Sequence, residues 1–250
     1  MALTFGAATS DRVTLSAGLN NEHAFSVLAW VYKTADTNGR RIWHKGSGNL
    51  KTFFLHFAAG GNDFAVFVAR ATTSSDTISV TGVLPDNEWS CVACTYDESD
   101  GGRLFKGSLT ATIAEVSYSS RIVGSGTSSD DSGTAHIVGN DSTNVQAFPG
   151  RIARLAHFKR RMTAQEIIAW QFRPYTDADA DIYMDLGYTG TSTQPNLTSL
   201  GTGINGTVTG ATVSDHVPLP PPFLAAHGYR GASLTKIPIR SQHIDFDYSR

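Results

Sequence analysis

The sequence lacks several features that would point to particular classes of protein. It has two cysteines and five glutamates among 250 residues, and no apolar run approaches the roughly 18 residues of a membrane-spanning helix. Lys and Arg number 20 against 22 Asp and Glu, so no excess of one charge favours nucleic acid or an anionic membrane as a partner. Because no basic, apolar and small-residue pattern follows Met1, we expect neither a secretion signal nor membrane insertion.

The scarce cysteines are expected to be free thiols. Cys91 and Cys94 lie in an alternating stretch typical of a strand, and the alternation places them on opposite faces. Three residues of strand separate them by roughly 10 Å, whereas a disulfide needs Cα atoms within about 7 Å. A redox Cys-x-x-Cys motif would need the N-terminus of a helix at this point, which the pattern does not provide.

The composition favours strands and turns. Gly reaches 24, and 17 of the 22 acidic residues are Asp, residue types that favour turns over helices. Short alternating segments recur about every 8 to 12 residues, the spacing of a sandwich or barrel. Residues 25–32 are apolar on both faces, as in a central strand of a covered sheet. We also expect a hairpin turn at 97–102, a strand at 110–116 and a closing strand at 207–213.

One short helix is expected between Thr163 and Phe172. Thr163-x-x-Glu166 is a capping box that follows an alternating strand ending at Phe158, and it marks the helix start. Pro174 cannot continue the helix and disfavours helical geometry at the residue before it.

The last part of the chain differs in character from the rest. Residues 218–223 are Pro-rich and predict an extended polyproline-type segment, in which Pro220 and Phe223 are candidate docking residues. Ile244, Phe246 and Tyr248 alternate with polar residues and present an apolar edge. This tail could fold back on its own domain, or it could act as an arm that docks on a neighbouring subunit.

Several ordered stretches resemble the laminin-G-like, concanavalin-A-like jelly-roll lectin domains. The match covers most of the chain before Pro218. The stretches that carry it are residues 25–31, 41–46, 89–97, 104–107, 148–152 and 162–167. The resemblance implies an all-β fold, a two-sheet antiparallel jelly-roll sandwich with one short helix, followed by an extended C-terminal arm. We expect residues 1–217 to form the sandwich and residues 218–250 the arm.

The resemblance implies binding of glycans or proteins, sometimes with calcium, although the same scaffold also carries glycosidases. The related retaining enzymes supply two carboxylates from a Glu-x-Asp-x-Glu or Glu-x-Asp-x-x-Glu strand, and their carboxyl groups lie about 5 to 5.5 Å apart. The five glutamates here form no such motif. We therefore expect a protein that is not an enzyme.

Candidate binding residues lie in two places. Trp43 and His44 would form a sugar-stacking platform if the Trp43 ring faced outward. Asn140 and Asp141, or the pair Asp130–Asp131, offer oxygen ligands for calcium, although such residues also serve as ordinary turn formers.

The organisation of the chain favours an assembly role. We expect an accessory or decoration protein of a bacteriophage particle, docked through its arm, present in the virion or in the host cytoplasm during assembly, and homo-oligomeric or bound to the particle. The alternative is a soluble carbohydrate-binding module, with calcium as a candidate cofactor.

Overall fold

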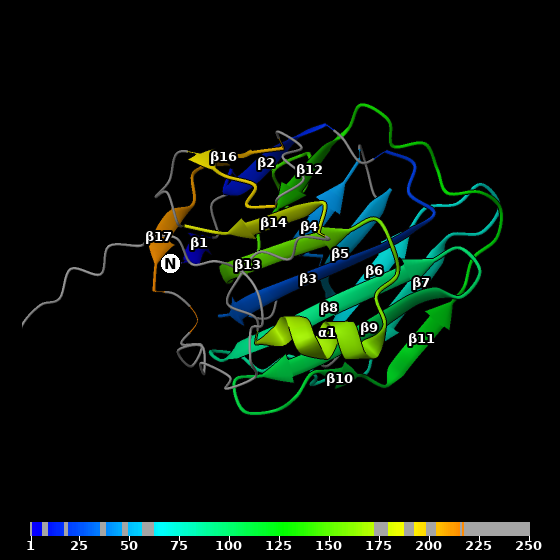
Figure 1. The fold of residues 1–250 in the computed structure, drawn as a ribbon, viewed down its shortest axis with the longest axis horizontal. Helices are drawn as coiled ribbons and strands as arrows, with labels where there is room; N and C mark the ends of the chain where they lie inside the picture. The colour runs from blue at the N-terminus through cyan, green and yellow to red at the C-terminus, as the bar shows by residue number, and fades with distance from the viewer. Residues whose placement is uncertain are drawn as a thin grey trace, which may run out of the picture. The chain divides into compact units, whose positions relative to one another are not determined.

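The computed structural model describes residues 2–6, 10–17, 20–35, 39–46, 50–56, 63–172, 180–187, 193–198, 204–215 and 217. These residues form two antiparallel sheets packed as a sandwich, with one helix on the outer surface of the first sheet (Figure 1). This arrangement confirms the expected all-β jelly-roll sandwich with one short helix. The expected arm, residues 218–250, lies outside the described residues together with its proposed docking residues Pro220, Phe223, Ile244, Phe246 and Tyr248.

The first sheet, called sheet A, has the long strands of the domain at its centre. In spatial order it consists of β10 (Ala114–Glu115), β9 (Gly101–Ser108), β8 (Trp89–Asp97), β3 (Ala24–Lys33), β13 (Gly150–Phe158), β1 (Ala2–Phe5) and β17 (Thr212–Ser214). A further strand, β14 (Ile182–Asp185), also pairs with β13.

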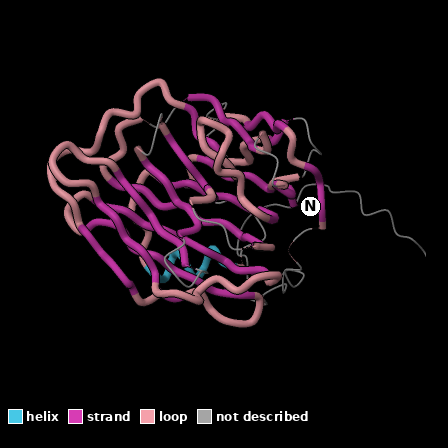
Figure 2. Tube along the Cα trace, turned by 180° about the vertical axis from the view of Figure 1, so that it is seen from behind, coloured by secondary structure: helices cyan, strands magenta, loops and turns pink. Residues whose placement is uncertain are grey.

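The second sheet, called sheet B, forms the opposite layer. In spatial order it consists of β11 (Tyr118–Ile122), β7 (Ser75–Ser79), β6 (Asp63–Val68), β5 (Lys51–His56), β4 (Arg41–Lys45), β12 (Ala135–Val138), β2 (Arg12–Ala17), β16 (Gly206–Thr209) and β15 (Thr193–Gln194). Seen from behind, strands and loops lie toward the viewer and the helix lies beyond them (Figure 2).

Alternation along β3 divides the buried side chains into two clusters. Phe25, Val27 and Val31 pack in the core between the sheets, whereas Leu28 and Trp30 join the cluster on the outer face of sheet A. The strand is therefore buried on both faces, as its sequence predicts. On β8 the same alternation puts Cys94 between the sheets and Cys91 on the outer face, and both are free thiols.

The helix α1 (Ala164–Gln171) covers the outer face of sheet A. Thr163 is its N-cap, the predicted capping box with Glu166 is formed, and Phe172 is the C-cap. Ile167 and Trp170 point into the outer cluster. Within the described residues, no helix has the length and hydropathy to span a membrane.

Two strand predictions are wrong in detail. Residues 110–116 contribute only the short β10, because Gln171 rather than a neighbouring strand binds the amide of Ile113. The expected strand 207–213 is split between β16 in sheet B and β17 in sheet A. The break occurs at Gly210, whose φ of +73° favours glycine and whose added Cβ would lie 2.2 Å from an Asp11 oxygen. The predicted hairpin turn between β8 and β9 is confirmed.

Candidate saccharide pocket

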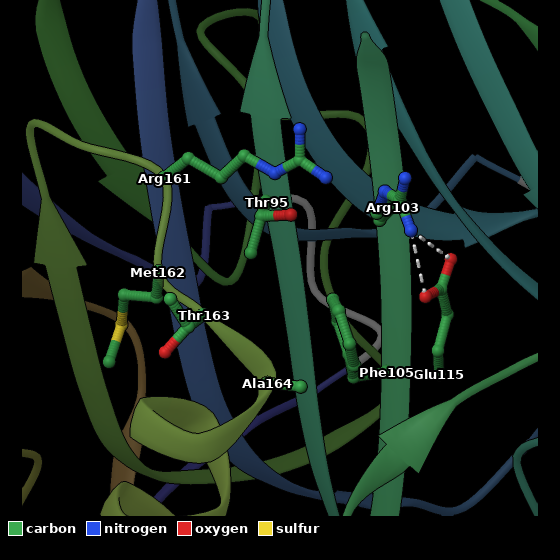
Figure 3. A pocket seen from close by; sticks show the side chains of 8 residues that line it. All are labelled: Thr95, Arg103, Phe105, Glu115, Arg161, Met162, Thr163 and Ala164. Carbon is green, nitrogen blue, oxygen red and sulfur yellow. Dashed lines mark hydrogen bonds and ion pairs between the residues drawn. The ribbon is translucent and has the colours of Figure 1, made fainter.

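A pocket opens on the outer face of sheet A beside the start of α1 (Figure 3). Its volume is about 350 Å³. We call it the Thr95 pocket, and its lining residues are Thr95, Arg103, Phe105, Glu115, Arg161, Met162, Thr163 and Ala164. They come from β8, β9, β10 and the segment that enters the helix, so distant parts of the sequence meet here.

Apolar side chains form one part of the lining. Phe105 projects from β9, and in Figure 3 Ala164 is drawn near it while Met162 lies on the other side of the pocket. Met162 is held in place through its backbone, since its amide donates to the Ser26 hydroxyl at 2.9 Å and that hydroxyl donates to the Arg160 carbonyl at 2.8 Å. The apolar side of the pocket is therefore fixed to the central strand of the sheet.

Thr95 contributes an unusual polar group. Its position on β8 continues the outward-facing series of Trp89, Cys91 and Ala93, which is otherwise apolar. The Thr95 side chain is buried and lines the pocket, and its hydroxyl has no hydrogen-bond partner among the residues that the structure describes. A buried hydroxyl without a partner is costly and is rare in folded proteins. It is an unsatisfied polar group on a residue that lines the pocket.

Charged side chains form the other wall. The Arg103 guanidinium binds Glu115 at 3.1 Å and Asp100 at 2.9 Å, and Arg161 binds Asp100 at 2.6 Å. Hydrogen bonds from Arg121 first, and from Arg103 and Arg161, hold the pKa of Asp100 well below its usual value. Arg103 and Arg161 are about one-third exposed, so each retains N–H donors that can reach a ligand.

The start of α1 contributes side chains to the pocket, but its backbone is already capped. The Thr163 hydroxyl accepts from the Glu166 amide at 3.3 Å, and the Thr163 amide donates to the Glu166 carboxylate at 2.7 Å. This backbone hydrogen bond, with help from Arg160, lowers the pKa of Glu166. The pocket therefore depends on side-chain donors and acceptors rather than on free helix amides.

The lining combines one carboxylate with apolar and hydrogen-bonding groups. Among the described lining residues Glu115 is the only carboxylate, and it is engaged by Arg103 and by the Tyr118 hydroxyl. Glycoside hydrolysis in its common form needs two carboxyl groups on either side of the scissile bond. The pocket instead combines an apolar surface with several hydrogen-bonding groups, the usual composition of a small-molecule site.

The residues expected to form a sugar platform lie elsewhere. Trp43 is fully buried and packs against Phe25 with ring centroids 5.6 Å apart. The condition for the platform, an outward ring, is not met, because the alternation of β4 turns Trp43 into the core between the sheets. His44 is buried as well, between the Gly46 carbonyl at 2.8 Å and the Thr52 hydroxyl at 3.2 Å.

Asn140 and Asp141 organise their own loop. Asn140 accepts from the amides of Asp141 and Gln146, and Asp141 accepts from the amides of Thr143 and Val145 and from the Thr143 hydroxyl. These contacts are turn chemistry. Asp141 lies close enough to His44 to act on its charge, but neither residue lines the Thr95 pocket.

Asp131, a candidate calcium ligand, binds lysines instead. The Lys51 ammonium lies 2.8 Å from its carboxylate and the Lys45 ammonium 3.4 Å, and all three side chains are buried. Burial alone would raise the pKa of Asp131, but the hydrogen bond from the Asn21 amide and the charge of Lys51 outweigh it and lower the pKa. In the described part of the chain, no group of three or more His, Cys, Asp and Glu side chains could hold a metal ion.

One feature of the sequence could have indicated the Thr95 pocket. Thr95 is the polar member of an otherwise apolar series on one strand face, which can be read from alternation alone. Arg103, Glu115 and Arg161 gave no such signal, because only the pairing of β8 with β9 and the path into α1 bring them together.

Comparison with known proteins gives one family. The model of the concanavalin A-like lectin/glucanases superfamily matches residues 7–168. No curated protein matches the chain.

One similar solved structure shares the fold, and a second is reported for comparison. The first is a protein of Bacteroides ovatus with a provisional carbohydrate-binding assignment: the TM-score is 0.60 at 17% identity, over 86% of this chain and 59% of that one. This chain therefore spans about three-fifths of that protein. Domains LG4-5 of the mouse laminin alpha1 chain give a TM-score of 0.46 at 14% identity, over 66% of this chain and 43% of that one.

Proposed function

Because the chain belongs to the concanavalin A-like lectin/glucanases superfamily, we propose that it is a non-enzymatic lectin-like protein that binds saccharides, with the Thr95 pocket as a binding site. The observation that carries the proposal is the buried, unpartnered Thr95 hydroxyl in a pocket that also offers an aromatic side chain, Phe105. A sugar ring presents hydroxyls at its edge and C–H groups on its faces, so it needs both kinds of surface at once.

The charged wall supports the same ligand class. A sugar hydroxyl both donates and accepts hydrogen bonds, as a Ser or Thr hydroxyl does. Arg103 supplies donors and Glu115 supplies acceptors at the same side of the pocket (Figure 3). Their mutual ion pair fixes both groups before a ligand arrives, which reduces the entropy lost on binding.

The expected role in a bacteriophage particle stays a prediction, as does the expected location. It depends on residues 218–250, whereas the saccharide proposal depends on residues that the structure describes. The two proposals are compatible, because a particle-bound protein could also bind glycans.

The test uses the methionine methyl groups, because Met162 lines the pocket and Met184 is buried in the core between the sheets. The protein labelled with methyl-¹³C methionine is titrated with neutral and uronic-acid oligosaccharides, and the Met162 signal is assigned with the Met162→Leu variant. We expect at least one saccharide to shift the Met162 signal and leave Met184 unchanged.

A matched variant makes this test specific. Thr95→Val keeps the shape of the side chain and removes the hydroxyl, so it should weaken that saccharide about three- to tenfold, the effect of one lost hydrogen bond. The proposal fails if no saccharide shifts the Met162 signal at millimolar concentration. It also fails if Thr95→Val binds as tightly as the natural sequence.

A further inference from the structure

A second pocket lies on the same outer face of sheet A, at the other end of β8. Thr95 lies six positions after Trp89 along this strand, which corresponds to roughly 20 Å. We call it the Trp89 groove. Its volume is about 360 Å³, and its lining residues are Tyr32, Asn87, Glu88, Trp89, Ser108, Leu109 and Thr110.

Two aromatic rings form the apolar part of the groove. Tyr32 and Trp89 meet edge to face, with ring centroids 5.5 Å apart and an interplanar angle of 60°. The Arg151 guanidinium lies 4.9 Å from the centre of the Tyr32 ring and does not line the groove. These contacts fix the orientation of the rings, and rings already fixed lose little entropy when a ligand packs on them.

Free polar groups stand beside the rings. The side chains of Asn87 and Glu88 are exposed and have no hydrogen-bond or ion-pair partner among the described residues. The Asn87 backbone is nevertheless fixed, with a φ of +58° and its amide bonded to the Lys33 carbonyl at 2.7 Å. The adjacent ion pair between Lys33 and Asp86, at 2.5 Å, holds the same turn. A planar amide and a carboxylate are thus presented on a rigid turn.

The helix connects the groove with the Thr95 pocket. Its first turn lines that pocket, while the side chain of its last residue, Gln171, binds the carbonyls of Ser108 and Ala111 and the amide of Ile113. Ser108 lines the Trp89 groove. The two sites are therefore built on one rigid frame and face the same side of the molecule.

We propose that the Trp89 groove is a second saccharide site, which takes an uncharged sugar unit. This proposal takes its class of ligand, a saccharide, from the proposed function. The position of the site is argued from the Tyr32–Trp89 pair and the Asn87 amide, independently of the Thr95 pocket. Glu88 is the one acidic side chain among the described lining residues, and no lysine or arginine lines the groove to pair with an acidic sugar. The hydroxyls of an uncharged sugar can donate to Glu88 and accept from Asn87.

Two sites on one face let a single chain hold two units of a glycan polymer. When both sites engage one polymer, the second binding event becomes intramolecular and the overall affinity exceeds that of either site. A polymer should therefore be retained more strongly than its disaccharide.

The test uses the four tryptophans of the chain. Trp89 lines the groove, whereas Trp30, Trp43 and Trp170 are buried elsewhere. The protein labelled with ¹⁵N-tryptophan is titrated with neutral disaccharides of glucose, galactose, mannose, xylose and arabinose and with a uronic-acid disaccharide. The Trp89 indole signal is assigned with the Trp89→Phe variant. We expect a neutral disaccharide to shift this signal.

A variant designed to keep the fold removes the Asn87 amide and the charge of Glu88. Asn87→Gly keeps the left-handed backbone, and combined with Glu88→Gln it should weaken binding reported by Trp89 at least tenfold. Binding reported by Met162 should not change. Unchanged binding at Trp89 in this variant contradicts the proposal.

The two probes separate the two proposals. A shift of Met162 without any shift of Trp89 overturns the second site and leaves the first. A shift of Trp89 alone overturns the Thr95 pocket and leaves the groove. A uronic-acid disaccharide that shifts Trp89 more strongly than every neutral one overturns the assignment of an uncharged ligand.

Discussion

Lys51 and Asp131 form an ion pair of 2.8 Å in which both side chains are buried, although 80 positions separate them in the sequence. Glu22 lies 4.0 Å from the same ammonium and Lys45 lies 3.4 Å from the same carboxylate. The pair ties the beginning of β5 to the loop before β12. Removal of Lys51 alone leaves the buried Glu22 and Asp131 carboxylates with Lys45 as the remaining lysine beside them, so one buried negative charge is in excess.

Lys51→Met should therefore destabilise the protein by about 3 to 5 kcal/mol, the usual cost of breaking a buried ion pair from one side. The measurement is the free energy of unfolding in urea. The double variant Lys51→Met with Asp131→Asn should lose less than the single variant, because it removes the unpaired charge.

The exposed ion pair of Arg160 and Glu166 is the control for the stability lost in Lys51→Met. Arg160 and Glu166 lie 2.8 Å apart with 44% and 38% of their side chains exposed, and Arg160→Gln should cost about 1 kcal/mol or less. Equal losses for Lys51→Met and Arg160→Gln would show that burial does not determine the cost.

Local patterns predicted much of the fold. The helix was predictable because its start depends on Thr163 and Glu166, three residues apart, and the free cysteines were predictable because alternation alone separates Cys91 from Cys94. The break at Gly210 was not predictable, since residues 207–213 alternate as a strand on either side of it. The approach of Asp11 leaves no room for a side chain at position 210, and that approach is a tertiary contact.

The surroundings of the candidate binding residues depend on tertiary structure. The sequence of β4 does not show that Trp43 faces the core between the sheets, whereas alternation along β8 does mark Thr95 as a polar residue in an apolar series. The carboxylate of Asp131 is of the kind that binds calcium, but its partners in the structure are Lys45 of β4 and Lys51 of β5. Such pairings follow from strand order, which alternation does not determine.

The stability of the protein should fall in weak acid because of His44. Burial, together with the charge of Arg41, lowers the pKa of this ring from 6.5 to about 4, although the Gly46 carbonyl and Asp141 act in the opposite direction. The unfolded chain therefore binds more protons between those values. The stabilisation from neutral His44 is present above about pH 6.5 and is lost as the pH falls toward 4, by about 2 to 3 kcal/mol.

His44→Gln is the matched variant for this pH effect. Its side-chain amide can still donate to the Gly46 carbonyl, and it does not titrate. The free energy of unfolding of the variant should therefore depend less on pH between 6.5 and 4, while the other histidines contribute equally to both proteins. If the free energy of unfolding depends on pH in the same way in both proteins, His44 is not responsible for the loss of stability in weak acid.

Gln171 should be important for stability, because its side chain satisfies three backbone groups of the segment between β9 and β10. Gln171→Leu leaves the buried Ile113 amide without its acceptor and should cost about 2 to 3 kcal/mol in urea unfolding. The control is Gln165→Leu on the same helix, since Gln165 is exposed and should change stability by about 0.5 kcal/mol or less. A small effect of Gln171→Leu would mean that the segment finds other partners.

Thr95→Val should leave the folded protein as stable as before or up to about 1 kcal/mol more stable, because the lost hydroxyl has no partner in the fold. Thr77→Val is the matched control: the Thr77 hydroxyl is also buried in a strand but donates to the Gly102 carbonyl at 3.1 Å, so its loss should cost about 1 kcal/mol. Urea unfolding measures both. If the Thr95 hydroxyl instead contributes to the fold, Thr95→Val will lose as much stability as Thr77→Val. If Thr95→Val raises the free energy of unfolding and Thr77→Val lowers it, the fold gains no stability from the Thr95 hydroxyl. This is the result expected of a group that serves a ligand.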